Sequence, residues 1–548
     1  MIKASLIGIC LVGMSCIAFG QDTSRRRSID ITSTFKPVLR EAVKVNFNAA
    51  PPVVDTTRPR LTYNIPAENL FFTYQPAELK PVALEPDSGG AWGYSNFIKI
   101  GIGNVHQPYL KAGFSFGNGE NTFFNIFANH YSSKGKLPLQ KNSNTSVFGT
   151  ATYKTAKNLE WTGGLGFVSD DYFLYGTPDS LLYSKEELRQ RFQTIEGKLS
   201  LRNIIPTEYG LSYNPSLRVS YFSDKHTQAA SEVNTILDLP ITKTFGRNVG
   251  FNLGATADLT NYRLNTVDKT SINNNLFLIS PAVLLITPNL NLNAGLTPSW
   301  DNGSFHMLPN FMADITTTDK RFTIQVGWIG YYNKGSYQRF ASINPWLAQP
   351  SDSLLLNTRV NEWYAGFKGS LGNHFSYFAK TGFQQHRNIP LFVNNYMGKH
   401  NFDIIYEPTL NIFQTHIEAQ YTVGEQFSAK AAIDWNYFKL EQEDKAWGLI
   451  PVELNATLRW QVLKDLFFRT ELLAFDGARY KGINGRSFKG ETGLDLNAGA
   501  EFRITKNFNI WLQMNNIFNN RYERWNRYEV FGFNILGGIV YNFNQPGN

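Results

Sequence analysis

The feature of this sequence that most constrains its fold is a regular alternation of apolar and polar residues in segments of roughly ten residues. In the clearest segment, one set of alternate positions holds Val452, Leu454, Ala456, Leu458, Trp460 and Val462, and the other holds Glu453, Asn455, Thr457, Arg459 and Gln461. Successive side chains of a β-strand point to opposite faces of the sheet, so each set lies on one side. Similar segments recur at 249–259, 427–437 and 494–504, and the series runs from about Tyr94 to Phe543. This segment length suits a tilted strand that crosses the hydrocarbon layer of a membrane.

The connections between these segments fall into two length classes, which separates a membrane barrel from a soluble β-sandwich with the same alternation. Tight connections lie at 155–158, 288–289, 318–320, 372–373, 424–426, 464–465 and 505–507. Longer, polar connections lie at 169–190, 263–274, 334–357, 388–401 and 480–490. Outer-membrane barrels have short turns on the periplasmic side and long loops on the extracellular side. We therefore predict an all-β chain whose residues 91–548 form a transmembrane antiparallel β-barrel in contact with outer-membrane lipid.

The number of short connections predicts the number of strands. Ten connections on the turn side, including looser ones near 117–121, 203–214 and 243–248, join twenty strands. A first strand near Tyr94 and a last strand that ends at Phe543 bring the total to about 22, and an even number is typical of a bacterial barrel. Twenty strands is the main alternative, because residues 204–211 and the Glu407-Pro408 step can each be a bulge, a bend or a connection.

The first twenty residues have the parts of a secretory signal peptide. Lys3 precedes an apolar stretch from Leu6 to Phe19, which ends on a small-x-small step at Gly20. We therefore predict a signal peptide over residues 1–20. Both cysteines of the chain fall within it, which excludes disulfides and thiolate metal sites from the rest. Beyond it, no apolar run reaches the ~18 residues of a membrane-spanning helix, so a helical inner-membrane protein is excluded.

Residues 21–90 differ from the rest of the chain because they contain eight prolines, from Pro37 to Pro86. Proline at this density forbids long helices and central strands, so we expect an extended segment. One interpretation is a disordered periplasmic tail. The other is that its aromatic residues Phe71, Phe72 and Tyr74 dock in the lumen or at its periplasmic mouth. A barrel of this size needs a filled lumen to preserve the permeability barrier, and this segment is the only candidate that we identify from the sequence.

The C-terminal stretch 507–522, which reads NFNIWLQMNNIFNNRY, and the later Val540-Tyr541-Asn542-Phe543 resemble the closing strands of TonB-dependent receptors. In that family, the penultimate strand ends in an Asn-Leu-Phe-like step before a Tyr, and the last strand ends on an aromatic residue. The resemblance implies a 22-strand transport barrel. Receptors of this family carry a plug of well over a hundred residues, whereas only about seventy precede the first strand here. We therefore expect no plug of ordinary size. The step Ile29-Asp30-Ile31-Thr32 is too short to identify a TonB box, so the sequence does not support TonB as a partner.

If the apolar face contacts lipid, charged residues of the other face line the lumen. The candidates are Lys430, Asp434, Glu453, Arg459, Arg469, Glu471, Asp495, Glu501 and Arg503. One interpretation is that mixed charges solvate a wide interior and hold loops in place. The other is a selectivity lining for an anionic or zwitterionic solute. The two signs are interleaved, so no strong ion selectivity is predicted.

Composition and spacing argue against several other classes of function. The eight histidines are scattered singly, and only His416 has a carboxylate partner, Glu418, on the same strand face. We therefore predict no enzyme, and we predict neither a metal nor a cofactor. The net charge of +8 is spread along the chain rather than grouped in basic blocks, which argues against nucleic acid as a partner. Aromatic residues make up 14% of the chain, a content that suits the interfacial girdles of membrane barrels.

Two classes of function remain open. The first, which we favour, is transport of solutes across the outer membrane by a barrel related to the receptors. The second is a structural subunit of an outer-membrane complex for secretion, assembly or motility, held to periplasmic or outer-membrane protein partners.

Overall fold

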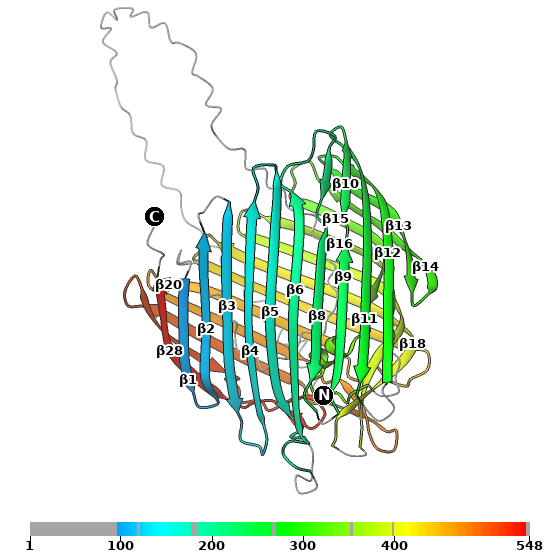
Figure 1. Cartoon of the computed structure of the whole chain (residues 1–548). Coiled ribbons are helices and arrows are strands. Elements are labelled where there is room, and N and C mark those ends of the chain that lie inside the picture. Colours follow the sequence, from blue (N-terminus) through cyan, green and yellow to red (C-terminus); the bar gives the residue numbers. More distant parts are fainter. Residues whose placement is uncertain are drawn as a thin grey trace, which may run out of the picture. The chain divides into compact units, whose positions relative to one another are not determined.

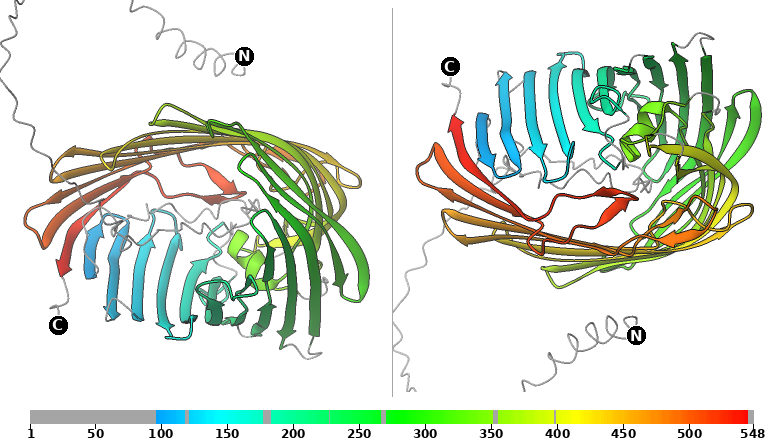
Figure 2. Two further views of the ribbon diagram at one scale, coloured as in Figure 1. Left: turned by 90° about the horizontal axis from the view of Figure 1, so that it is seen from above. Right: turned by 90° about the horizontal axis from the view of Figure 1, so that it is seen from below.

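The structure is a computed structural model that describes residues 96–117, 121–176, 183–226, 228–265, 270–350, 355–396 and 399–543. These residues form a closed antiparallel β-barrel, shown from the side in Figure 1 and along its axis in Figure 2. Each barrel strand pairs with the next along the chain, and β1 pairs with β28 from Asn96 opposite Phe543 to Gly103 opposite Leu536. This last pairing, which we call the closing seam, removes both edges of the sheet. The predicted fold class is therefore confirmed.

The barrel has 22 strands, as predicted, rather than 20. Their bounds are β1 (Asn96–Gly103), β2 (His106–Gly117), β3 (Thr122–Lys134), β4 (Lys141–Lys154), β5 (Leu159–Phe173), β6 (Arg189–Asn203), β8 (Ser216–Asp224), β9 (Ala230–Asp238), β11 (Val249–Leu264), β12 (Thr270–Ile286), β13 (Leu290–Asp301), β14 (Ser304–Thr316), β15 (Phe322–Asn333), β16 (Thr358–Leu371), β17 (Phe375–Asn394), β18 (Phe402–Val423), β19 (Phe427–Leu440), β20 (Val452–Leu463), β21 (Leu466–Phe475), β24 (Gly493–Arg503), β25 (Phe508–Asn515) and β28 (Asn534–Phe543). Their lengths are unequal: β18 has 22 residues, whereas β25 has 8.

Two short strands continue barrel strands past a proline. Strands β7 (Leu211–Tyr213) and β10 (Ile241–Phe245) pair with each other beyond Pro215 and Pro240, which lie in the gaps before β8 and after β9. Proline has no N–H to donate to the ladder of hydrogen bonds, so the ladder is interrupted there. The register is unchanged across the gap, since Ser216 lies opposite Asp238 and Tyr213 opposite Ile241.

The sequence left two positions open as a bulge, a bend or a connection, and the structure resolves them differently. Residues 204–210 connect β6 to β7, so they are a true turn-side connection. The Glu407-Pro408 step lies inside β18, which continues through it. Arg387 opposite Thr409 and Ile389 opposite Glu407 keep one register on both sides. The intervening Asn388 adopts a left-handed φ of 57°, which accommodates the irregularity opposite the proline without ending the strand.

Short turns and longer loops lie at opposite ends of the barrel, with some departures from the predicted lengths. Strand β5 extends to Phe173, β11 to Leu264 and β17 to Asn394, so three of the predicted loops were too long. Polar strand ends that leave the hydrocarbon band still pair with their neighbours, and polarity alone therefore overestimates a loop. One connection on the loop side is tight: Asn302 and Gly303, with φ of 49° and 88°, turn β13 into β14 as a two-residue hairpin.

The strands expose apolar side chains and bury polar ones, which is the reverse of the distribution in a soluble protein. Large apolar residues such as Val283, Ile417 and Trp363 are more than 40% exposed, whereas polar residues of the other face such as Asn274 and Glu362 are buried. Exposed apolar residues on the outside of a closed barrel suit contact with lipid. No helix in the described ranges is long and apolar enough to span a membrane.

Five further elements lie in loops. They are the helix α2 (Tyr337–Ile343) and the strands of two hairpins, β22 (Arg479–Lys481) with β23 (Ser487–Lys489) and β26 (Glu523–Trp525) with β27 (Tyr528–Glu529). Figure 2 shows α2 and the β26–β27 hairpin inside the ring of strands. The largest apolar cluster of the described residues includes Tyr337, Phe340, Trp525 and Tyr528, so the main core lies within the lumen.

Candidate functional site: two loops that meet inside the barrel

The first inward loop, described over residues 334–350 and 355–357, carries α2 into the lumen. Ser336 caps the helix, since its hydroxyl accepts a hydrogen bond from the backbone N–H of Arg339 at 3.2 Å. Tyr337, Phe340 and Ala341 have helical i, i+3, i+4 spacing and form its buried face. The short helix is therefore held by packing on the barrel wall, because seven residues are too few for a stable isolated helix.

Tyr337 is the centre of an aromatic cluster against that wall. Its ring is nearly perpendicular to the rings of Phe222, Tyr262 and Phe192, with centroids 5.3, 5.6 and 6.2 Å away. Such edge-to-face pairs each contribute about 0.5–1.5 kcal/mol beyond area burial. The Tyr337 hydroxyl donates to the Asp224 carboxylate at 2.9 Å. Burial, and then the Asp224 charge, raise the pKa of Tyr337 well above its usual value, so the phenol remains a donor.

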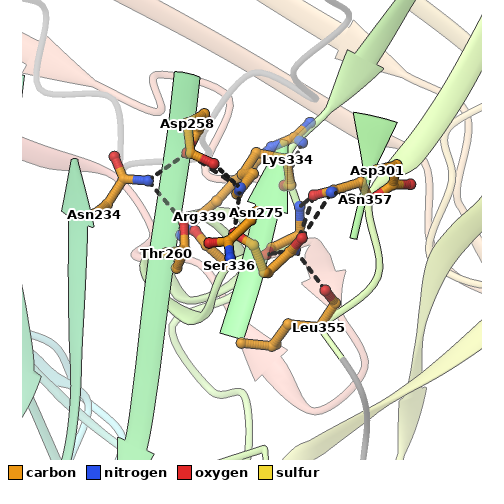
Figure 3. Close-up of polar contacts among 12 residues, drawn as sticks. Asn234, Asp258, Thr260, Asn275, Asp301, Lys334, Ser336, Arg339, Leu355 and Asn357 are labelled. Atoms are coloured by element: carbon orange, nitrogen blue, oxygen red, sulfur yellow. Dashed lines mark hydrogen bonds and ion pairs between the residues drawn. The ribbon is translucent and has the colours of Figure 1, made fainter. Parts of the chain in front are cut away.

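A polar cluster fastens the two ends of the same loop (Figure 3). The ammonium group of Lys334 donates to the backbone carbonyls of Asp258 and Asn274 at 2.9 and 2.7 Å, and it forms an ion pair of 3.2 Å with the Asp258 carboxylate. The Asn274 amide donates to the carbonyls of Gly335 and Leu355 at 2.8 and 2.6 Å. One wall residue therefore binds both the entry and the exit of the loop. We call Lys334, Asn274 and Asn357 the loop anchor.

Asn357 completes the loop anchor. Its amide donates to Asn274 Oδ1 and to Asp301 Oδ1, both at 2.7 Å, and its own oxygen accepts the backbone N–H of Gly335 at 2.9 Å. Burial lowers the pKa of Lys334, and the Asp258 carboxylate opposes that effect. A buried network in which every member finds partners is rigid and specifies one conformation.

The second inward loop, residues 516–533, carries the β26–β27 hairpin. Asn516 holds its base: the amide donates to the carbonyls of Asn520 and Phe531 at 2.7 and 2.9 Å. The backbone N–H of Asn516 donates to Asn497 Oδ1 on the wall at 3.0 Å. Further along, the Trp525 ring packs on Phe392 and Phe402, with centroids 5.4 and 5.3 Å away. The hairpin is therefore fixed at its base and along its length.

The two loops meet where Trp346 and Tyr528 stack. Their ring centroids are 4.1 Å apart with planes 22° from parallel. The Trp346 indole also donates to the carbonyl of Phe173 at 3.1 Å, and the Tyr528 hydroxyl donates to the carbonyl of His400 at 3.1 Å. Each half of the contact is thus bound to a further loop or strand end. We call the described residues of the two loops together, 334–350, 355–357 and 516–533, the loop bridge.

The charged residues that we predicted as a lumen lining lie on four neighbouring strands, β19, β20, β21 and β24, and most have local partners. Lys430 is 2.9 Å from Glu418, Asp434 is 2.8 Å from His416, and Glu453 accepts from Asn455 at 2.8 Å. Glu501 lies 3.5 Å from Lys99, and Arg503 pairs with Asp465 of the turn side at 3.1 Å.

The remaining candidates do not gather into one site either. Arg459 lies opposite Arg469 in the register of β20 and β21, and Glu471 lies opposite Asn497. Asp495 contacts the loop bridge, where it accepts from the Tyr522 hydroxyl at 3.3 Å. A selectivity role for these nine residues stays a prediction. Phe71, Phe72 and Tyr74, like the signal peptide and the proline-rich segment, lie outside the described residues.

The expectation that only residues 21–90 could fill the lumen is wrong, because the loop bridge occupies part of it. Sequence reasoning missed Tyr337, Phe340, Trp346, Trp525 and Tyr528. In the sequence, these residues are marked only as aromatic residues within otherwise polar loops, as in Trp525-Asn526-Arg527-Tyr528. Their contacts depend on residues far away in the chain, since Tyr337 and Asp224 are separated by 113 positions.

No protein-family model matches the sequence, and no curated protein matches it. Solved structures do match the barrel. The FrpB iron transporter from Neisseria meningitidis aligns with a TM-score of 0.65 and 10% identity, over 82% of this chain and 81% of that chain. The pyoverdine outer membrane receptor FpvA from Pseudomonas aeruginosa aligns with a TM-score of 0.62 and 11% identity, over 82% and 78%. A ferric enterobactin receptor (PfeA) mutant from Pseudomonas aeruginosa aligns with a TM-score of 0.61 and 11% identity, over 82% and 80%.

These structures are TonB-dependent receptors with 22-strand barrels, so the resemblance first noted in the last strands extends over the barrel. At such low identity the likeness shows the fold alone. That fold is an outer-membrane barrel, in agreement with the predicted location. The matched proteins are transporters and receptors rather than enzymes.

Proposed function

We propose that this protein transports a solute across the outer membrane and that the loop bridge is its gate. The observation that carries the proposal is the stacked contact of Trp346 with Tyr528, which joins two loops from opposite parts of the chain inside the lumen. The receptor-like fold of the barrel supports transport over a purely structural role.

A passive pore needs an unobstructed lumen, and an unfilled barrel of 22 strands would be wide enough to breach the permeability barrier. The loop bridge instead contributes to a packed apolar cluster inside the lumen, which supports partial closure by these loops. Loops are also the elements that most readily change conformation. A solute that binds the open state more tightly than the closed one would shift the equilibrium toward opening.

Single-channel conductance in planar bilayers tests the gate. The chain is compared with a double variant, Trp346→Ala with Tyr528→Ala, in which the contact between the loops is lost. The matched control is Trp363→Ala with Tyr421→Ala, because both of these rings are exposed on the outer face of the strands. We expect the unaltered chain and the control to remain closed most of the time, and the bridge variant to show large, frequent openings. A deletion of residues 21–90, alone and combined with the bridge variant, measures any contribution of that segment.

Two results would overturn the proposal. An unaltered chain that conducts continuously, at the level of an empty barrel, would show that the loop bridge is no gate. A combined variant that stays closed, or a barrel that is obtained only together with fixed partner proteins, would favour the structural subunit instead.

A further inference from the structure

The outer face of β16, β17, β18 and β19 carries three parallel rows of side chains near the loop end of the barrel: an aromatic row, an amide row and a basic row. We propose that these rows bind a phosphorylated lipid of the outer leaflet, with its acyl chains on the aromatic row and its phosphate on the basic row. The rows lie on the opposite face of the wall from the loop bridge, so this site does not depend on the proposed gate.

The aromatic row crosses neighbouring strands at one level of the register. Trp363, Phe383 and Phe413 lie opposite one another in β16, β17 and β18, and each is more than 40% exposed. Tyr437 of β19 continues the row opposite Phe413, and Trp328 of β15 precedes it opposite Trp363. The rings of Trp328 and Trp363 are stacked, with centroids 6.1 Å apart. The row is therefore a broad apolar surface on which acyl chains can pack.

The aromatic row marks the extracellular edge of the apolar band on β16. Toward the turn side of Trp363, the outward positions as far as Leu371 hold alanine, phenylalanine, glycine and leucine. Toward the loop side, the next two outward positions hold Asn361 and Arg359. The stretch 363–371 has the ~9–11 residues of a tilted membrane-spanning strand. Outward side chains beyond it therefore reach the headgroups of the outer leaflet.

The basic row consists of two arginines that lie directly opposite each other, Arg359 on β16 and Arg387 on β17. Each is four positions from a ring of the aromatic row, Trp363 or Phe383, so strand alternation places both on the same outward face. Both line one hollow of about 310 Å³ at the loop end. Like charges directly opposite each other destabilise a strand pair, and an anion bound between them removes that repulsion. The guanidinium fork matches the oxygens of a phosphate group in particular.

The amide row lies between the other two. Asn361, Gln385 and Asn411 lie opposite one another, and Gln385 donates to Asn411 at 3.4 Å. The exposed Lys439 of β19 follows opposite Asn411 and adds a third positive charge. Amide groups can donate to the ester or amide carbonyls that join acyl chains to a headgroup. The order of aromatic, amide and basic rows therefore matches the order of chemical groups along a phosphorylated lipid.

The carboxylates near the basic row are occupied by other donors. Glu407 is fully buried and accepts the backbone N–H groups of residues 441–443, each at 2.8 Å. Asp301 lines the same hollow as the arginines, and its Oδ1 accepts from Asn357 and Asn302 at 2.7 and 3.1 Å. Within the part of the chain that the structure describes, none of the three basic residues forms an ion pair with a carboxylate. Their charge is therefore available to a lipid phosphate.

Lipid titration of the detergent-solubilised full chain, followed by native mass spectrometry, tests the inference. The probes are diphosphoryl lipid A, the same lipid after removal of both phosphates, and inorganic phosphate as a competitor. The test variant is Arg359→Gln with Arg387→Gln, which keeps both side chains polar but removes their charge. We expect it to raise the dissociation constant for diphosphoryl lipid A about thirtyfold, the usual contribution of two basic residues at an anionic lipid surface. The phosphate-free lipid should bind the unaltered chain as weakly as diphosphoryl lipid A binds the variant.

The matched control is Arg263→Gln with Lys243→Gln, which removes the same net charge from β11 and β10, outside the three rows. It should leave the dissociation constant unchanged. Without lipid, the test variant should resist urea at least as well as the unaltered chain, because a like-charge pair has been removed. A variant that loses stability together with binding would indicate a structural role instead. Equal binding of the two lipids, displacement of lipid by millimolar inorganic phosphate, or equal losses in test and control variants would each overturn the inference.

Discussion

Trp511 on β25 donates its indole N–H to the backbone carbonyl of Ile100 on β1 at 3.2 Å, across the intervening strand β28. The path is open because Gly538 lies opposite Trp511, and Gly101 lies opposite Gly538 in the next pair. The indole therefore lies over two glycines, and the Lys99 ammonium group sits 4.3 Å from its ring centroid. One side chain thus connects three strands at the closing seam.

We expect Trp511→Ala to destabilise the barrel by about 3–5 kcal/mol, because it removes a large buried ring as well as the hydrogen bond. Trp511→Phe keeps most of the apolar contact and should lose about 1 kcal/mol. Urea unfolding, followed by the gel mobility shift between folded and unfolded barrel, gives both values. A Trp511→Ala variant as stable as the unaltered chain would contradict a role of this contact in closure.

Gly538→Ala should lower the yield of closed barrel, since a Cβ at this position would collide with the backbone carbonyl of Ile100. Gly163→Ala on β5 is the control, because nothing lies within 4 Å of a Cβ there. The folded fraction after refolding into detergent micelles measures the difference. Equal yields for the two variants would mean that the seam is more open than the structure shows.

Tyr337→Phe should loosen the first inward loop by about 1–3 kcal/mol, because the buried Asp224 carboxylate loses its hydroxyl donor while the ring packing is retained. Faster amide hydrogen exchange in α2 is the expected result. Tyr421→Phe, at an exposed ring on the outer face of β18, should leave that exchange unchanged. If α2 exchanges at the same rate in both variants, the bond to Asp224 does not hold the loop.

The first inward loop should also loosen in mild acid through His226. Its ring nitrogen Nε2 lies 2.6 Å from Gln190 Oε1, and the Gln190 amide donates to the carbonyl of Leu347 at 3.0 Å. Burial lowers the pKa of His226 below its usual 6.5, while Asp224 opposes and Lys399 reinforces this shift. A lowered folded-state pKa stabilises the fold above the unfolded-state pKa, and this contribution is lost as the pH falls through the folded-state value. Hydrogen exchange in the loop should therefore rise below pH 6.5 in the unaltered chain, and His226→Gln should reduce that dependence.

The orientation of β20 is testable by cysteine accessibility. We expect an aqueous thiol reagent to label cysteines at Glu453, Arg459 and Gln461 but not at Val452, Leu454, Leu458 or Trp460. The physical reason is that Arg or Lys at the bilayer midplane costs about 2–4 kcal/mol, so the polar set must face the lumen. Labelling at Leu454 but not at Glu453 would reverse the assignment.

The sequence predicts the barrel well because its determinants are local. Alternation along Val452–Leu463 marks a strand without any knowledge of its neighbours, and turns such as Gly372, with φ of 64°, are marked by residue type. The loop bridge could not be predicted in this way. Whether Trp346 points to solvent or into the lumen depends on Tyr528, and no periodic pattern links positions so far apart. The pocket that Trp346, Tyr528 and Asp495 line was therefore not predicted, although Asp495 itself was predicted to face the lumen.

The unequal strand lengths have a consequence for the surrounding lipid. At about 3.3 Å per residue and a tilt near 40°, the eight residues of β25 reach roughly 20 Å along the membrane normal, less than the ~25 Å apolar band of typical outer-membrane barrels. The 22 residues of β18 extend well beyond that band. A bilayer adapts to such hydrophobic mismatch by changing its local thickness. We therefore expect the membrane to be thinner along β25 and β28 than along β17 and β18, so that the acyl chains are least ordered beside the seam that Trp511 closes.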